Sequence, residues 1–463
     1  MNSPSAEQPH RPTGEFSGQA PALIERVVNL MDPSGDVILN LSHDQACAAV
    51  QSGDAEAVRK IRGQFAICRQ EGKTIRMARS IGRPMRYFLA KRAEGPALII
   101  AERMDQILNQ LREEGLEDQF HPSYTRMVPA HYLLELQLVG CPDPNPQLTR
   151  YFAPERNRLP ADIDAIGALY IERLAEVIDQ FLVTIPDDEP IGVMFSGGID
   201  SGSILMIVEH LLRRRGQSPS RMKAFTLAVE GRPGDLEQSR EFLKAVQMEM
   251  LLEPIEVPAE KVRWQDAVAS IEDYKPLDVQ SATMGYALLR ELRERYPDWK
   301  YLLDGDGGDE NLKDYPIEDN PELTIRSVLG NRMLYQEGWG VDAVKHSLVY
   351  SGGQSRGHSR TSAPAAQFGF KGLSPYAIPD VIEIAEAVPF VALTDWDHQK
   401  LYSLKGQIVA AGIQHLTGNE MPVFEKRRFQ HGAADSETFA RLFPDDDQAY
   451  RDEFKKMTEE KLG

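Results

Sequence analysis

IGVMFSGGIDSGSI, residues Ile191–Ile204, is the stretch of sequence that decides the fold of this chain. An apolar run ends at Phe195, three small residues follow, and a helix is expected from Asp200–Ser201 onward. The N–H groups of a glycine turn and of a helix start form an anion site, because their dipoles converge there. Gly197 and Gly198 lack a Cβ and would let a phosphate approach the main chain closely.

The side chains of this turn extend the expected phosphate site. Ser196 and Ser201 can donate from their hydroxyls, and Asp200 is placed to hold Mg²⁺ beside the phosphates. The pattern is neither a Walker sequence, since no Gly-Lys-Ser/Thr follows, nor GxGxxG. The alternative is a purely structural corner in which Asp200 or Ser201 caps the helix.

Strands and helices alternate on the carboxyl-terminal side of the chain. The expected strands are IGVMF, MKAFTLAV, IEVP and WKYLLDGD, and the expected helices span 162–182, 201–215, 236–249 and 282–296. Apolar strands separated by helices indicate βαβ units and a parallel sheet. The tail from Ile317 onward is expected to be mostly helical. This part therefore predicts the α/β class.

Residues 21–152 are expected to form a separate, sheet-rich α+β domain. Apolar runs between polar turns predict strands at DVILNLS, GQFAICR, TIRMARS, MRYFLAK and ALIIAE, with helices over 45–61 and 102–116. Residues 1–20, rich in Pro, Ser and Gly, are expected to be a disordered tail. The proline-rich segment 141–160 predicts the boundary, so that residues 153–463 form the second domain.

KYLLDGDGGDENL, residues Lys300–Leu312, is a second strand that ends in glycines and carboxylates. The carboxyl ends of parallel strands meet at one edge of a sheet, so this loop should lie beside the glycine turn. Its carboxylates, Asp304, Asp306, Asp309 and Glu310, would repel one another unless a cation such as Mg²⁺ neutralised them. An acidic surface loop is the alternative.

Composition narrows the classes of function. The 463 residues carry 52 basic and 70 acidic side chains, and the net charge of −18 argues against nucleic acid as the main partner. Cys47, Cys68 and Cys141 form no close pair, which excludes a disulfide scaffold and a CxxC site. No apolar run approaches about 18 residues, and the polar start does not resemble a signal sequence. We therefore expect a cytoplasmic protein without membrane contact.

These motifs resemble a known family. SGGIDS resembles the PP-loop of N-type ATP pyrophosphatases, and its spacing from the acidic loop resembles the synthetase domain of asparagine synthetase and β-lactam synthetase. AFTLAVEG, Ala224–Gly231, is similar to the family strand whose backbone meets adenine. IEDYKPLDVQSAT is similar to the stretch before the acidic loop. More loosely, the amino-terminal strands resemble the Ntn-type glutaminase domain of that family.

The resemblance implies that ATP adenylates a substrate carboxylate with the help of Mg²⁺, that pyrophosphate leaves, and that an amine displaces AMP. It assigns ATP and pyrophosphate binding to Ser196, Gly197, Gly198, Asp200, Ser201 and Gly305, with Val193, Phe195 and Leu227 as neighbours of adenine. It assigns the metal to Asp200 and Asp309. Asp306 stands where the family commonly has Glu or another small residue.

Two catalytic candidates follow from the resemblance. Glu322 could take the proton of the amine, and Lys426 could steady the acyl-transfer oxyanion. The alternatives are an exposed helical glutamate for Glu322, and Arg427 or Arg428, or a solvated basic run, for Lys426. The glycine-rich stretch Ser351–Arg360 could close over a substrate or serve as a linker.

The chain departs from the family pattern in two places. Glutamine-hydrolysing members place a nucleophilic cysteine second, where this sequence has Asn2, so glutamine hydrolysis is not expected. Cys68 lies in an apolar strand and is expected to be a core residue. After Asp309–Glu310 this chain continues NLKDYP in place of LFGGY, so its acyl substrate should differ from aspartate.

The first hypothesis is therefore an AMP-forming amide synthetase that joins a small-molecule or peptide carboxylate to an amine. The resemblance to the glutaminase-like fold suggests a homodimer. Intramolecular cyclisation to a β-lactam or macrolactam is an alternative within the same class. A PP-loop enzyme that thiolates tRNA is opposed by the cysteine spacing and the negative charge. A non-catalytic nucleotide-binding subunit is opposed by the intact motifs.

Overall fold

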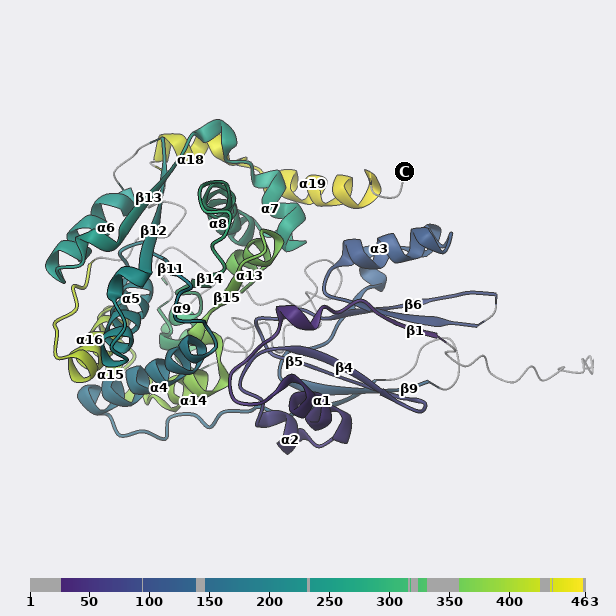
Figure 1. Ribbon diagram of the computed structural model, residues 1–463, viewed down its shortest axis with the longest axis horizontal. Helices are drawn as coiled ribbons and strands as arrows, with labels where there is room; N and C mark the ends of the chain where they lie inside the picture. The colour runs from purple at the N-terminus through teal and green to yellow at the C-terminus, as the bar shows by residue number, and fades with distance from the viewer. Residues whose placement is uncertain are drawn as a thin grey trace, which may run out of the picture.

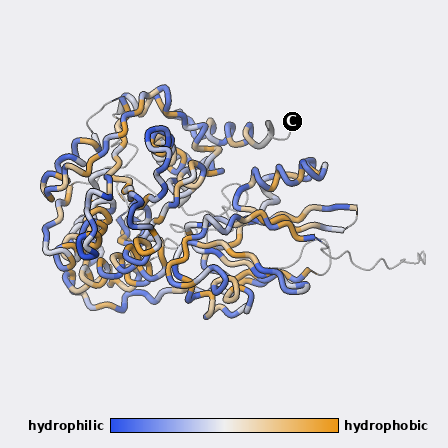
Figure 2. Tube along the Cα trace, viewed as in Figure 1, coloured by the Kyte–Doolittle hydropathy of each residue, from blue (hydrophilic) through white to orange (hydrophobic). Residues whose placement is uncertain are grey.

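The computed structural model describes residues 26–93, 95–138, 146–230, 234–314, 317, 324–330, 358–424, 434 and 436–460. Two parts lie side by side (Figure 1): an amino-terminal part rich in strands, and a larger carboxyl-terminal part in which helices surround a sheet. Hydrophobic residues concentrate along the strands of the amino-terminal part, and hydrophilic residues are frequent on the outer helices (Figure 2).

The carboxyl-terminal part is built on one sheet of five parallel strands in the order β13-β12-β11-β14-β15. In that order the strands span Leu252–Val257, Met222–Val229, Ile191–Met194, Tyr301–Leu303 and Lys371–Leu373. The strand β12 is buried along nearly its whole length, as expected for a parallel sheet covered on both faces. The predicted α/β class of this part is confirmed.

Each face of this sheet packs on its own hydrophobic cluster. One face is covered by α4 (Ile163–Val183), α5 (Ile199–Arg214), α6 (Gly234–Ala245), α14 (Pro379–Ala387) and α16 (His398–Thr417). The other face is covered by α8 (Pro276–Arg295), α13 (His358–Gln367) and α18 (Ser436–Leu442). The remaining helices are α7 (Trp264–Ile271), α9 (Gly308–Leu312), α10 (Ile325–Gly330), α15 (Phe390–Thr394) and α19 (Asp447–Glu460).

The amino-terminal part stacks two sheets between helices. One sheet contains β1 (Arg26–Asn29), β7 (Ala97–Ala101), β6 (Arg86–Ala90) and β8 (Arg126–Met127). The other contains β10 (Gln147–Arg150), β9 (Tyr132–Gln137), β5 (Thr74–Arg79) and β4 (Ala66–Glu71). A buried cluster fills the space between the sheets, and further clusters join α3 (Met104–Glu113) to the first and α1 (His43–Ser52) to the second. The predicted α+β class is confirmed.

Two expectations about the elements are corrected, and a third is confirmed with an addition. The helix expected over 45–61 is two helices, α1 and α2 (Ala55–Arg59), because Gly53 has φ 74° and ends the first one. DVILNLS forms only the short strand β2 (Val37–Ile38), which pairs with β3 (Gly63–Gln64). The described residues of the tail from Ile317 onward are mostly helical, as expected. The tail also contributes β15, whose three residues are too few to show a period.

The two parts also share a core. The cluster around α3 includes residues of α7, α8 and α19 from the carboxyl-terminal part. An ion pair joins the fully buried Arg86 of β6 to Glu272 at the end of α7, with 3.2 Å between Nε and Oε2. The division of the chain at residue 152 stays a prediction. Within the described ranges, no helix is both long enough and apolar enough to cross a membrane.

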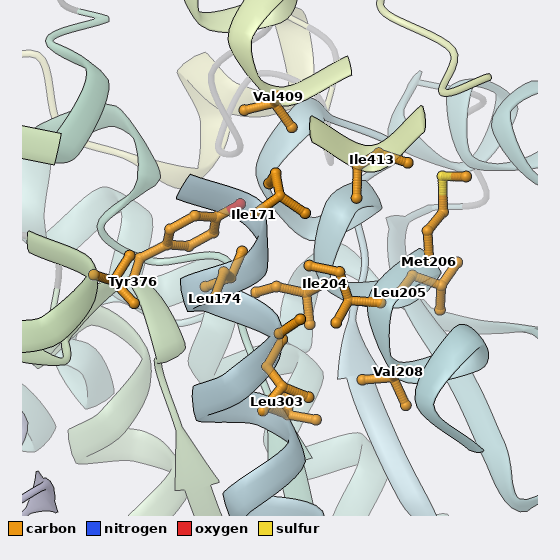
Figure 3. Close-up of a cluster of buried hydrophobic side chains, with 14 of the residues drawn as sticks. Ile171, Leu174, Ile204, Leu205, Met206, Val208, Leu303, Tyr376, Val409 and Ile413 are labelled. Atoms are coloured by element: carbon orange, nitrogen blue, oxygen red, sulfur yellow. The ribbon is translucent and has the colours of Figure 1, made fainter. Parts of the chain in front are cut away.

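The cluster on the α4 face of the sheet brings three helices together over β14. Figure 3 shows Ile171 and Leu174 of α4 beside Ile204 of α5, with Val409 and Ile413 of α16 nearby. The helices α4 and α16 approach closely where two glycines meet. A Cβ on Gly412 would lie 2.2 Å from the carbonyl oxygen of Gly167, which is closer than atoms can pack.

We therefore expect Gly412→Ala to destabilise the protein, because the added methyl forces α4 and α16 apart. The cost of overpacking, roughly 1–3 kcal/mol, should exceed the roughly 1 kcal/mol that alanine adds to helix stability. Thermal unfolding measures the difference. The matched control is Gln414→Ala on the exposed side of the same helix. A melting temperature of Gly412→Ala at or above wild type would contradict this crossing.

Candidate functional site

The glycine turn lies at the carboxyl end of β11, where α5 begins with Gly198 as its N-cap. Gly197 has φ 73°, and a Cβ there would lie 2.8 Å from the backbone nitrogen of Ser239, so only glycine suits this position. The backbone N–H of Ser196 donates to Ser201 Oγ at 3.2 Å, and the two hydroxyl oxygens are 3.3 Å apart. The turn is therefore held by its own hydroxyl groups.

The acidic loop follows β14, the neighbour of β11, and it touches the glycine turn. A Cβ on Gly305 would lie 2.9 Å from the backbone nitrogen of Ser201, and a Cβ on Gly308 would lie 2.1 Å from Asp200 Oδ1. The glycines of DGDGGDE thus let the loop pack directly against Asp200. The sheet brings the two sequence motifs together at one edge, as their pattern predicts.

A lysine that the sequence analysis missed lies between the carboxylates. Lys405 of α16 places its Nζ 2.6 Å from Asp200 Oδ2, 2.5 Å from Asp309 Oδ1 and 3.5 Å from Asp314 Oδ2. Its side chain is only 2% exposed. Burial alone would lower the pKa of Lys405, but the three carboxylates outweigh it and raise that pKa well above its ordinary value. The ammonium group is therefore charged at neutral pH.

The two expected metal ligands, Asp200 and Asp309, converge on this one ammonium group. In the part of the chain that the structure describes, no group of three His, Cys, Asp or Glu side chains is arranged to hold a metal ion. Two carboxylates completed by phosphate oxygens and water match the usual coordination of Mg²⁺ in nucleotide sites. The residues present therefore fit a metal that arrives with a nucleotide.

Two further carboxyl groups of the acidic loop, those of the buried Asp304 and the half-buried Asp306, have no ammonium partner among the described residues. Asp304 accepts from Ser374 Oγ at 3.0 Å and from the backbone N–H of Asp306 at 3.0 Å. Burial raises the pKa of Asp304 to about 7, against the lowering effect of these hydrogen bonds. Burial, and then the neighbouring Asp304, raise the pKa of Asp306 well above its ordinary value, although Thr361 donates to it.

The side chains of the three residues expected to contact adenine do not lie together. Val193 and Phe195 are buried in the cluster on the α4 face of the sheet, whereas Leu227 is buried on the α8 face. Phe195 also forms an edge-to-face contact with Phe242 of α6, with 5.4 Å between ring centroids. If these three residues contact adenine, the contact comes from their backbone atoms. Their assignment stays a prediction.

Several candidate residues lie outside the described residues. These are Glu322, Lys426, Arg427, Arg428, Cys141 and most of the stretch Ser351–Arg360. The last residue of that stretch, Arg360, is described: its Nε lies 3.2 Å from Asp278 Oδ1. Of the other cysteines, Cys47 is buried, and burial raises the pKa of Cys68 to about 12. Neither thiol is suited to act as a nucleophile near neutral pH.

The fold is an α/β domain in which the glycine turn and the acidic loop meet at one edge of a parallel sheet. Residues 182–356 match the family described as asparagine synthase, and this segment contains both the glycine turn and the acidic loop. This segment of the chain is therefore similar to the asparagine synthase family.

One relative is similar to this chain over a shorter stretch. It is named probable asparagine synthetase [glutamine-hydrolyzing], from Acanthamoeba polyphaga mimivirus. It is 29% identical to this chain over 124 residues, which is 27% of this chain and 21% of the relative. The chain therefore matches about a fifth of that protein's length.

The contacts of Lys405 predict the effect of removing its charge. In Lys405→Met, three carboxylates lose their shared cation, and breaking a buried ion pair costs up to about 3–5 kcal/mol, less where water screens the charges. We expect a lower melting temperature, and we expect Mg²⁺ to raise it more in the variant than in wild type. Lys400→Met, at an exposed position on the same helix, is the control. An unchanged melting temperature would contradict the cluster.

The pKa of Asp304 predicts a dependence of stability on pH. Because its folded-state pKa is about 7 and its ordinary value is 3.8, the folded state favours the protonated carboxyl. The contribution of the Asp304 carboxyl to stability is fully present below about pH 4 and is lost as the pH rises through about 7. Asp304→Asn stays neutral and should remove this part of the dependence. Melting temperatures measured across that range check it, and parallel curves for variant and wild type would refute it.

Proposed function

We propose that this chain is an ATP-dependent, AMP-forming amide-bond synthetase. It adenylates a substrate carboxylate and transfers the acyl group to an amine, without hydrolysing glutamine. One observation carries the proposal: the glycine turn, the acidic loop and Lys405 converge at one edge of a parallel sheet. The turn and the loop lie in the segment that matches the asparagine synthase family.

The pyrophosphate of ATP would be held by the glycine turn. The backbone N–H groups at the start of α5 and the hydroxyls of Ser196 and Ser201 can donate to phosphate oxygens. When bound, Mg²⁺ on Asp200 and Asp309 would supply positive charge that stabilises the leaving pyrophosphate. Lys405 adds a fixed cation next to the same two carboxylates. Charge neutralisation and positioning are therefore the main contributions of the site to adenylation.

The second step needs a group that accepts the proton of the amine. Glu322 and Lys426 remain the proposed base and oxyanion partner. Asp306 is a further candidate, because it is half-buried in the acidic loop and its buried Oδ2 has no hydrogen-bond partner among the described residues. Burial and Asp304 raise its pKa, and a base works best when its pKa is near the operating pH.

An amine substrate is favoured over ammonia from glutamine. The two described cysteines, Cys47 and Cys68, have raised thiol pKa values and lie in or against hydrophobic clusters. We propose that the amino-terminal part is a glutaminase-like domain that has lost its catalytic role and keeps a structural one. The relative named as glutamine-hydrolysing matches only 27% of this chain, so its name does not extend to this part.

Cyclisation of a single substrate is the alternative within this class, and the site supports both reactions equally. The partners proposed are a carboxylate and an amine donor, not a nucleic acid or a membrane, with homodimer formation possible. A tRNA-thiolating enzyme would need a reactive cysteine and a basic surface, and the net charge is −18. A non-catalytic nucleotide-binding subunit would not need the carboxylates that surround Lys405.

The test is ATP–pyrophosphate exchange with a panel of carboxylic acids and Mg²⁺. We expect exchange with at least one acid, and a loss of roughly 100-fold or more in Asp200→Asn and Asp309→Asn, because charge stabilisation of the leaving group is lost. Asp164→Asn, at an exposed position on α4, should exchange like wild type. Absence of exchange with every acid, together with absence of ATP binding, would refute the proposal.

The same assay separates the two chemical steps. A variant that retains exchange but forms no amide identifies a residue that acts only in the second step. Glu322→Gln and Asp306→Asn are the pair to compare, because each replaces a candidate base by its neutral isostere.

A further inference from the structure

The strand β15 presents a buried edge that needs hydrogen-bond partners. Among the described residues it is the outer strand of the sheet, and there only its inner edge is paired, with β14. Lys371 N–H donates to Lys300 O at 2.7 Å, and Leu373 O accepts from Asp304 N–H at 3.3 Å. The backbone groups that point away from β14, Gly372 C=O and Ser374 N–H, lie on the outer edge of β15. Ser374 is only 1% exposed and Gly372 is half-buried, so water has limited access to these two groups.

Gln64 of the amino-terminal part supplies these partners. With its amide oriented to satisfy its neighbours, Nε2 donates to Gly372 O at 3.1 Å and Oε1 accepts from Ser374 N–H at 3.2 Å. Gln64 is 4% exposed and lies in β3, which is held by pairing with β2. One side chain therefore bonds to the edge of the catalytic sheet as a neighbouring strand would.

The contact continues from Ser374 into the acidic loop. The Ser374 hydroxyl donates to Asp304 Oδ2 at 3.0 Å, and Asp304 Oδ1 accepts from the backbone N–H of Asp306 at 3.0 Å. Asp304 is 6% exposed. A continuous series of hydrogen bonds thus runs from Gln64 through Ser374 and Asp304 to the backbone of Asp306.

We propose that Gln64 is a positioning residue for the acidic loop, so that the amino-terminal part sets the geometry of the synthetase site through β15. The structural effect stands on these contacts alone. Its catalytic consequence rests on the function proposed above. The amino-terminal part thereby contributes to the site without supplying a group that touches substrate.

The side chain of Gln64 packs closely against Gly82. A Cβ on Gly82 would lie 2.5 Å from Gln64 Cδ, so only a glycine at position 82 permits the observed placement. Gln64, Gly82 and Gly372 also line a cavity between the two parts of the molecule. Loss of the amide would therefore open the edge of β15 toward this cavity.

The test is hydrogen–deuterium exchange, read by mass spectrometry, on the full chain. In Gln64→Ala we expect exchange to become roughly tenfold faster in peptides covering 371–376 and 301–308, because two hydrogen bonds to the edge strand are lost. Exchange within β12 should stay at the wild-type rate. Gly82→Ala retains Gln64 but displaces its amide, and it should reproduce the effect.

Arg62→Ala is the matched control. It removes another contact between the two parts, the 3.1 Å ion pair of Arg62 with Asp380, which does not involve β15. We expect wild-type exchange in 301–308 for this variant. Equal acceleration in Arg62→Ala would show a general loosening and overturn the proposal. The proposal would also be overturned if exchange in Gln64→Ala were faster in 371–376 but not in 301–308. It would equally be overturned if exchange were faster in neither.

A kinetic measurement tests the catalytic consequence. With an acid that supports ATP–pyrophosphate exchange in wild type, Gln64→Ala should lower the maximal rate about tenfold and leave the KM for ATP within about twofold, because the glycine turn is untouched. An unchanged maximal rate would overturn the catalytic part. If wild type supports no exchange with any acid, the proposed function fails, whereas the hydrogen-exchange result still decides the positioning role.

Discussion

The site depends on one electrostatic constraint: the ammonium of Lys405 lies between three carboxylates at the carboxyl edge of the sheet. Asp200 comes from the glycine turn, and Asp309 and Asp314 come from the acidic loop and its end. Parallel strands bring these loops to the same edge, so their negative charges must meet. Without a shared cation they would repel one another, and the loops could not pack as closely as Gly305 and Gly308 allow.

The fold class and the meeting of the two motifs were predictable because their signals are local. An apolar strand, a glycine turn and a helix start lie within fourteen consecutive positions, Ile191–Ile204. The parallel sheet then determines where that turn and the acidic loop meet. The strand β15 was not predicted, because its three residues are too few to show a hydrophobic periodicity. Glu322 and Lys426 rest on resemblance, and the structure does not describe them.

Lys405 was missed although the sequence carries a signal for it. It lies 205 positions from Asp200, so no local motif joins them. Its position, however, follows the apolar stripe of α16, which contains Leu401, Leu404, Ile408 and Val409. A lysine on the buried face of an amphipathic helix needs a buried negative partner. That requirement identifies a charged site even where it cannot say which carboxylates form it.

The buried edge of β15 gives a physical reason for the chain to retain its amino-terminal part. An edge strand must be covered, because its unpaired backbone groups cost free energy when buried and invite wrong pairing when exposed. Gln64 covers this edge through two hydrogen bonds, and the cluster around α3 fixes the two parts by a shared core. The amino-terminal part, whose described cysteines have raised thiol pKa values, can therefore still support the site at the edge of the sheet, because the acidic loop is hydrogen-bonded to the strand that this part covers.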